Sequence, residues 1–109
     1  MARYTCMIHE GQGAEGRRGE LARGLQKIGR DLFGDPEDAE VAWIAIRKGY
    51  GFTAGKPSSS SLVARTVPFG LSQARREEFM TRVCKLWKDA TGCSDAEIVV
   101  TAIDGPAPS

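Results

Sequence analysis

The sequence predicts an α+β fold in which two tandem β-α-β units form a four-stranded mixed sheet with two helices on one face. Segments with strand-like and helical apolar patterns follow in the order strand, helix, strand, twice over, and 109 residues suffice for one such domain, residues 1–109. The two halves also look alike, because Asp-Ala-Glu precedes the last strand of each, at 38–40 and at 95–97. Only two helices are available to cover these apolar strands, so we expect another subunit to cover the second sheet face.

The first unit spans about residues 1–47. A short strand-like run, Tyr4–Ile8, ends at the polar residue Glu10. The following segment carries apolar residues at i, i+4, i+7 and i+11 and then a glycine, which predicts an amphipathic helix with a glycine C-cap. These residues are Leu21, Leu25, Ile28, Leu32 and Gly34. The continuous apolar run Val41–Ile46 predicts a strand that is covered on both faces.

Residues 48–61 are rich in glycine and serine and predict a loop or a hairpin arm between the two units. The second unit spans about residues 62–104, with strands at 62–67 and 98–103, and residues 105–109 form a tail. Ser72 is a suitable N-cap for the helix between these strands, and Gly92 is placed to close it. Its apolar stripe consists of Phe79, Val83, Leu86, Trp87 and Ala90.

Charge and composition exclude several classes of protein. Fifteen Lys and Arg against fourteen Asp and Glu leave a net charge of +1, which provides no global field to capture nucleic acid or a membrane surface. No apolar run approaches the ~20 residues of a membrane span.

The three cysteines, Cys6, Cys84 and Cys93, are an odd number and lack CxxC spacing, so we expect reduced thiols in a cytoplasmic protein. His9 is the only histidine, which argues against a metal site, and we expect it at a surface or an interface.

One segment matches the GxGxxG pattern of dinucleotide-binding proteins. It covers residues 11–16, after a predicted strand and before a predicted helix. Glu10, however, would place a carboxylate beside the pyrophosphate, and the chain lacks a second mononucleotide-binding half. We therefore expect no nucleotide and no other cofactor.

A second segment, Lys48–Phe52, opens like the RNP1 motif of RNA-recognition domains, in which aromatic side chains stack on bases. A single-stranded RNA-binding module that uses Tyr50 and Phe52 is therefore an alternative function. The residues that follow, 53–58, do not continue the motif as a strand, and a further strand precedes the second helix. Both features argue against RNA binding.

Short motifs along nearly the whole chain together resemble the tautomerase superfamily, most closely its subgroup related to cis-3-chloroacrylic acid dehalogenase. They are Tyr4-x-Cys6, Glu10-Gly11, the helix closing at Gly34, Gly-Phe-Thr-Ala-Gly-Lys-Pro at 51–57, Gly-Leu-Ser at 70–72 and Ala-Thr-Gly at 90–92. Their order and spacing carry the resemblance. It implies a βαββαβ subunit that assembles as a trimer, with copies of itself or with a related subunit.

The resemblance also indicates which positions would form the site. In that family an N-terminal proline, exposed by removal of the initiating methionine, is the catalytic acid or base, and the matching residue here is Ala2. A helix-one histidine matches Gly29, two carboxylate-binding arginines fall at Pro68 and Leu71, and a strand-four tyrosine falls at Thr101. The chain also stops about where the subgroup's C-terminal extension, which carries a catalytic glutamate, would begin.

Two interpretations of the function follow. In the first, the chain is a tautomerase-like protein without the catalytic proline, inactive or much reduced in tautomerase and dehalogenase chemistry, which could bind a small organic acid. In the second, it is an altered tautomerase or isomerase that acts on a 2-oxo or enol acid. If Met1 is removed, the Ala2 α-amine would be a usable base near neutral pH. Another pocket group, such as Arg65, is a further candidate.

Overall fold

The computed structural model describes residues 3–11, 13–47, 52–53, 56–57 and 60–106. Its main sheet has four strands in the order β2-β1-β5-β6. The two central strands, β1 and β5, are antiparallel, whereas β1 pairs with β2 and β5 pairs with β6 in parallel. Each β-α-β unit thus supplies one parallel pair, and the predicted mixed sheet is confirmed. The strands are β1 (Tyr4–His9), β2 (Val41–Ile46), β5 (Ser61–Val67) and β6 (Ile98–Asp104).

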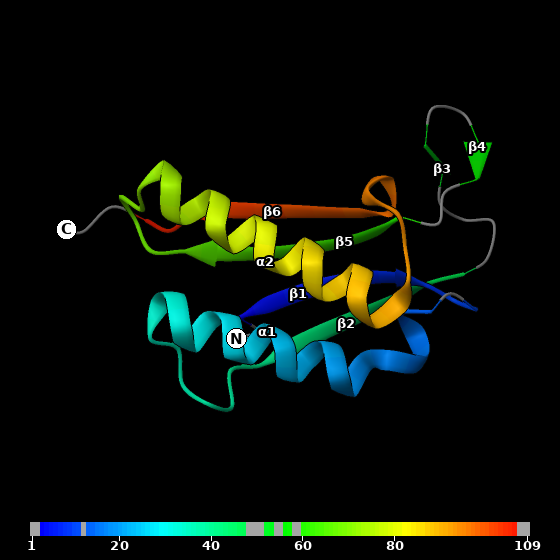
Figure 1. Cartoon of the computed structure of the whole chain (residues 1–109), viewed down its shortest axis with the longest axis horizontal. Coiled ribbons are helices and arrows are strands. Elements are labelled where there is room, and N and C mark those ends of the chain that lie inside the picture. Colours follow the sequence, from blue (N-terminus) through cyan, green and yellow to red (C-terminus); the bar gives the residue numbers. More distant parts are fainter. Residues whose placement is uncertain (1–2, 12, 48–51, 54–55, 58–59, 107–109) are drawn as a thin grey trace.

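Both long helices lie on the same face of this sheet (Figure 1). Helix α1 (Arg18–Phe33) follows a 3-10 turn, η1 (Glu15–Arg17), and helix α2 (Gln73–Thr91) precedes a second one, η2 (Asp95–Glu97). The predicted caps are confirmed. The Ser72 hydroxyl accepts a hydrogen bond from the Arg75 amide, and Gly34 and Gly92 end the two helices with φ of 69° and 73°. Only glycine takes up this left-handed conformation without steric cost.

The core fills the space between the helices and the sheet. The buried apolar side chains of β1 are Tyr4, Cys6 and Ile8, and they pack against the apolar stripes of both helices. Trp87 of α2 is buried as predicted, whereas Trp43 of β2 is only partly buried and lies with its ring centroid 6.3 Å from that of Trp87. His9, expected at a surface or interface, is 5% exposed and therefore buried within the subunit.

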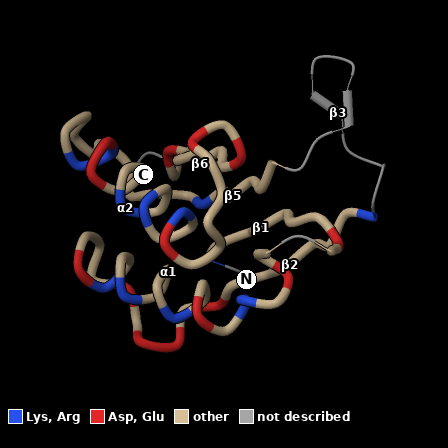
Figure 2. The backbone as a smooth tube through the Cα atoms, turned by 45° about the vertical axis from the view of Figure 1, so that its right-hand side comes forward, with Lys and Arg blue, Asp and Glu red and all other residues tan. Residues whose placement is uncertain are grey.

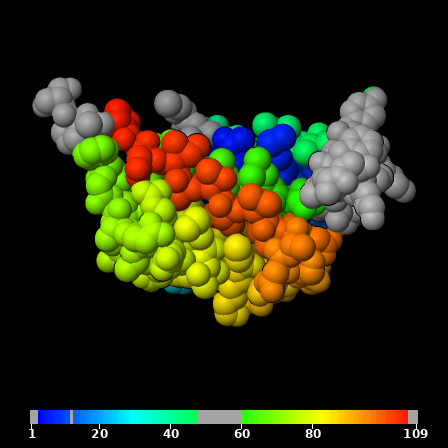
Figure 3. Space-filling model, turned by 90° about the horizontal axis from the view of Figure 1, so that it is seen from above, coloured from blue at the N-terminus to red at the C-terminus, as the bar shows by residue number. Residues whose placement is uncertain are grey.

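The other sheet face is uncovered among the described residues (Figure 3). Strand β2, which we predicted to be covered on both faces, leaves Ile44 47% exposed because no helix lies on that side. Val99 and Ile103 of β6 are similarly exposed, at 49% and 52%. Most charged residues lie instead on the helices and connecting segments (Figure 2). The subunit thus has an apolar face, as the strand pattern and helix count predicted.

Part of the segment between the units is described. Phe52–Thr53 (β3) and Lys56–Pro57 (β4) form a separate antiparallel pair, which agrees with a hairpin arm. Tyr50 lies outside the described residues. Because β3 is not a strand of the main sheet, Phe52 does not occupy the position that an RNP1 motif requires. Neither described helix is long and apolar enough to cross a membrane.

Candidate functional site

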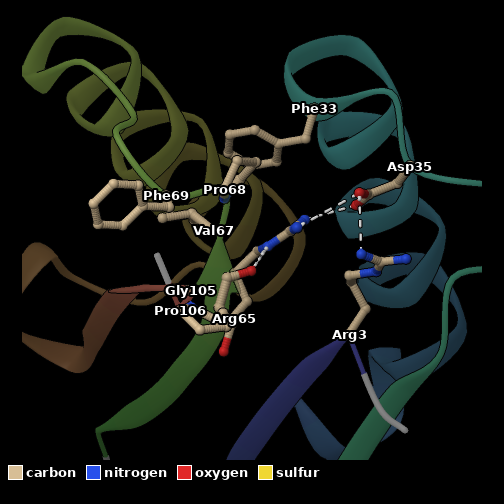
Figure 4. A pocket seen from close by; sticks show the side chains of 10 residues that line it. Arg3, Phe33, Asp35, Arg65, Val67, Pro68, Phe69, Gly105 and Pro106 are labelled. Atoms are coloured by element: carbon tan, nitrogen blue, oxygen red, sulfur yellow. Dashed lines mark hydrogen bonds and ion pairs between the residues drawn. The ribbon is translucent and has the colours of Figure 1, made fainter. Parts of the chain in front are cut away.

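A cavity of about 660 Å³ lies at the end of the sheet where β1 begins and β5 ends (Figure 4). Segments distant in the sequence meet there: the start of β1, the end of α1, the end of β5 with the loop that follows it, and the end of β6. The lining residues are Arg3, Phe33, Asp35, Arg65, Thr66, Val67, Pro68, Phe69, Gly105 and Pro106.

A buried ion pair forms the polar wall of this cavity. The guanidinium of Arg65 donates to the Asp35 carboxylate, with 2.6 Å between Nη1 and Oδ2 and 3.5 Å between Nη2 and Oδ1. The side chains are only 2% and 4% exposed. Arg65 also donates through Nε to the carbonyl of Thr66. Charge-assisted hydrogen bonds of this kind fix both groups in a single geometry.

Aromatic rings surround the Arg65 guanidinium. Its central carbon lies 4.5 Å from the Phe33 ring centroid and 5.1 Å from that of Tyr4, distances at which a cation is attracted by the ring face. The Tyr4 hydroxyl accepts a hydrogen bond from Arg65 and donates to the carbonyl of Leu25. Burial raises the pKa of Tyr4 above its ordinary value, against the opposing effect of the nearby Arg65 charge. Arg65 is thus held by contacts on several sides.

The end of α1 positions the carboxylate. Gly34 turns the chain into the left-handed conformation, and the amide of Asp35 then donates to the carbonyl of Gly29. The chain folds back at this turn, so that Asp35 lies against the helix next to Gly29. A Cβ at Gly29 would lie 2.1 Å from the Asp35 Oδ2 atom and 3.0 Å from the Tyr4 hydroxyl. The carboxylate can therefore reach Arg65 only because residue 29 has no side chain.

Arg3 supplies the third charge at the cavity. Its Nη1 atom lies 3.8 Å from the Asp35 Oδ1 atom, and its side chain is 43% exposed. Unlike the Arg65 guanidinium, this group is partly accessible to solvent. The rest of the lining is mainly apolar, from rings such as Phe33 and Phe69 and the prolines Pro68 and Pro106. The arrangement suits a small ligand with one anionic group and an apolar body.

The residues predicted for the site do not all meet at this cavity. Arg65 and Pro68 line it, and Gly29 lies directly behind Asp35. Leu71 is in the following turn, where its amide donates to the Pro68 carbonyl. Thr101 is exposed in β6 and alternates with Val100 and Ala102, which pack against the core, so it lies on the open sheet face. Ala2 lies outside the described residues.

Sequence reasoning missed Arg3, Phe33 and Asp35. Arg3 is a charged residue before a strand, and Asp35 stands in Gly34-Asp35-Pro36, where the sequence signals only the end of a helix. The only available signal was that Arg65 lies in an apolar strand and would need a buried anion as a partner. The sequence does not indicate which carboxylate is this partner, and only the tertiary structure identifies it as Asp35.

The other sequence motifs do not form a second functional site in the described part of the chain. No group of three or more His, Cys, Asp or Glu side chains there is arranged to hold a metal ion. In the GxGxxG segment, Gly11 has a φ of 78° and forms a turn at the end of β1. A Cβ at Gly13 would lie 3.3 Å from Thr91, so this glycine permits close packing of the connection against the end of α2.

No protein-family model and no curated protein matches the chain. Solved structures do match over nearly its whole length. Native Ps01740 is 26% identical, with a TM-score of 0.87, and the match covers 95% of this chain and 94% of that one. N1, a member of the cis-3-chloroacrylic acid dehalogenase family, is 17% identical, with a TM-score of 0.84 and coverage of 94% and 74%. A fused 4-OT solved as a symmetric trimer is 14% identical, with a TM-score of 0.82 and coverage of 94% and 85%.

These comparisons define the class of protein. The matched structures are tautomerase-superfamily members, and the four-stranded mixed sheet with two helices on one face is their shared fold. The chain has the tautomerase-superfamily fold, as the motifs in its sequence indicated.

Proposed function

We propose that this protein is a tautomerase-fold subunit that has lost proline-dependent proton transfer and binds a small organic acid. The observation that carries the proposal is the cavity in which Arg3, an accessible cation, faces an apolar wall. A carboxylate would pair with Arg3, and the hydrocarbon part of the ligand would contact Phe69 and the neighbouring prolines.

The sequence supports the loss of catalysis. Ala2 stands where the family has its proline, so the chain has no secondary amine at that position. The Arg65–Asp35 pair, although at the cavity, is already engaged with protein groups. Neither group is free to move a proton between carbon and oxygen.

The subunit is further proposed to assemble as a trimer of itself. The exposed apolar residues of β2 and β6 support self-association, and fused 4-OT is trimeric. A related, proline-bearing chain is the alternative partner. We also propose a cytoplasmic location, on the ground that the three cysteines carry no disulfide framework in the sequence.

The first prediction concerns turnover. We expect the protein to bind 2-oxopentanoate, measured by calorimetry, without accelerating the ketonisation of enolpyruvate above the uncatalysed rate. Intact mass establishes whether Met1 is present in the sample. An Ala2→Pro variant freed of Met1 is the comparison: rapid ketonisation by this variant alone would identify the missing nitrogen as the sole deficit.

The second candidate function, an altered tautomerase, makes the opposite prediction. Its support is that Arg3, which lines the cavity, directly follows Ala2 in the chain. Turnover by the natural protein that disappears on acylation of the Ala2 amine would overturn the first proposal and establish this one.

A further inference from the structure

The charges at the cavity nearly cancel. Among the described residues that line it, Arg3 and Arg65 are cationic and Asp35 is anionic, which leaves one surplus positive charge. The cancellation is local, because Asp35 pairs directly with Arg65 at 2.6 Å and only loosely with Arg3 at 3.8 Å. The surplus therefore resides on the accessible Arg3 guanidinium.

We propose that Asp35 is a specificity-determining residue. Its carboxylate neutralises the Arg65 guanidinium, so that the cavity binds acids with one carboxylate more tightly than acids with two. This inference rests on the proposed acid-binding function. A single carboxylate would satisfy Arg3. A second carboxylate would meet a wall in which the one other cation among the described lining residues, Arg65, is already paired with Asp35. Desolvating that second carboxylate without a partner would be unfavourable.

Gly29 makes this selectivity possible. Any side chain at position 29 would occupy the space of the Asp35 carboxylate, since a Cβ there would lie 2.1 Å from Oδ2. Without the carboxylate, the Arg65 guanidinium would present its charge to the cavity that it lines. The glycine in the helix and the aspartate after it thus act together to set the charge of the site.

The apolar wall defines the rest of the ligand. Val67, Pro68 and Phe69 follow Arg65 along the chain and line the cavity, and Phe33 faces them from the end of α1 (Figure 4). A methyl or alkyl terminus would bury apolar surface against these side chains. The ligand class that charge and lining define is therefore a short monocarboxylic acid with an apolar end.

Two ligands of equal chain length test the proposal. 2-Oxopentanoate and 2-oxoglutarate differ only in a terminal methyl against a terminal carboxylate, and their dissociation constants are measured by calorimetry at low ionic strength. We expect the natural protein to bind 2-oxopentanoate at least about fivefold more tightly, the effect of one unfavourable charge in a partly solvated site. Equal binding, or tighter binding of 2-oxoglutarate, would overturn the inference.

Variants then separate charge from shape. Asp35→Asn retains the size of the side chain but frees the Arg65 charge, so the preference should move toward 2-oxoglutarate by about fivefold or more. Asp35→Asn combined with Arg65→Gln removes both charges and should restore the preference for the monoacid. If the double variant prefers the diacid as the single one does, the net charge does not set the selectivity.

A third variant leaves the buried pair intact, in case Asp35→Asn does not fold. Phe69 is 57% exposed at the cavity, so Phe69→Lys adds a cation without disturbing the core and should shift the preference toward 2-oxoglutarate. Thr81→Lys, at an exposed position of α2, is the matched control and should leave it unchanged. If neither acid binds the natural protein, the proposed function fails; if both bind but the cavity variants do not alter their ratio, only the specificity inference fails.

Discussion

Gly29 is a glycine inside a helix, where this residue usually lowers stability. Replacing such a glycine with alanine in an exposed helix normally stabilises it by about 1 kcal/mol. At position 29 the balance reverses, because the missing Cβ is what admits the Asp35 carboxylate to Arg65. Position 29 therefore has a residue of low helix propensity because the buried ion pair needs the space that a side chain would fill.

We predict that Gly29→Ala destabilises the protein by about 2–4 kcal/mol. The added methyl displaces the carboxylate and leaves the Arg65 charge buried without its partner, a loss of about 3–5 kcal/mol that the helical gain only partly offsets. Urea unfolding measures the change. Gly19→Ala is the matched control, since a Cβ there meets only the Arg23 side chain at 3.5 Å, and it should be neutral or slightly stabilising. Equal effects at both positions would show that the displaced ion pair is not the cause.

At the scale of the element, strand β1 carries two ionisable side chains into the core. Tyr4 and Cys6 are both fully buried on the face that the helices cover. Burial disfavours a charged form, and it raises the pKa of the Cys6 thiol from 9.0 to about 12. The strand is thus compatible with the core only while both groups are protonated.

This burial predicts a loss of stability in alkali. Because the pKa of Cys6 is higher in the folded than in the unfolded chain, its contribution is complete below pH 9 and is lost as the pH rises toward 12. Between about pH 8 and about pH 10.5 we expect the free energy of unfolding to fall by roughly 2 kcal/mol from this residue, measured by urea unfolding at each pH. The raised pKa of Tyr4 acts in the same direction.

Cys6→Ala provides the control for this pH dependence. The variant should be less stable at both values of pH because it leaves a cavity, but its stability should fall less between them. An unchanged fall would mean that another group carries the alkaline transition.

At the scale of the whole molecule, the sheet face that the described residues leave uncovered supports the proposed self-association. Ile44, Val99 and Ile103 lie about half exposed on strands at the two edges of the sheet. Such an apolar face is costly in water and is typical of a surface that a second subunit covers. Both helices lie on the opposite side of the sheet (Figure 1), and no other described segment covers this face.

Ile44→Lys should therefore dissociate the assembly. We expect the natural protein to sediment at about three times 11.8 kDa and the variant at the mass of one subunit, because burying a lysine at the interface requires desolvating its charge. Thr81→Lys, on the exposed side of α2, should remain trimeric. A natural protein that sediments as a monomer at micromolar concentration would contradict the proposed trimer.

The sequence alone determined most of the architecture. Helical spacing from Leu21 to Leu32, the glycines at the helix ends and the N-cap at Ser72 are local signals, and the structure has helices with these ends. The repeated strand-helix-strand order predicted the mixed sheet and its uncovered face. These features are readable because each depends on residues close together in the chain.

The site depended on contacts between distant residues. Arg65 was a candidate from the sequence, but its partner Asp35 is 30 positions away and reaches it only through the turn at Gly34 and the space at Gly29. The sequence also could not show which candidate positions lie at the cavity. Pro68 lines it, whereas Thr101 faces away from the core on the open sheet face. Periodicity fixes which residues form an element, whereas the charge of a cavity is set by the side chains that packing brings together.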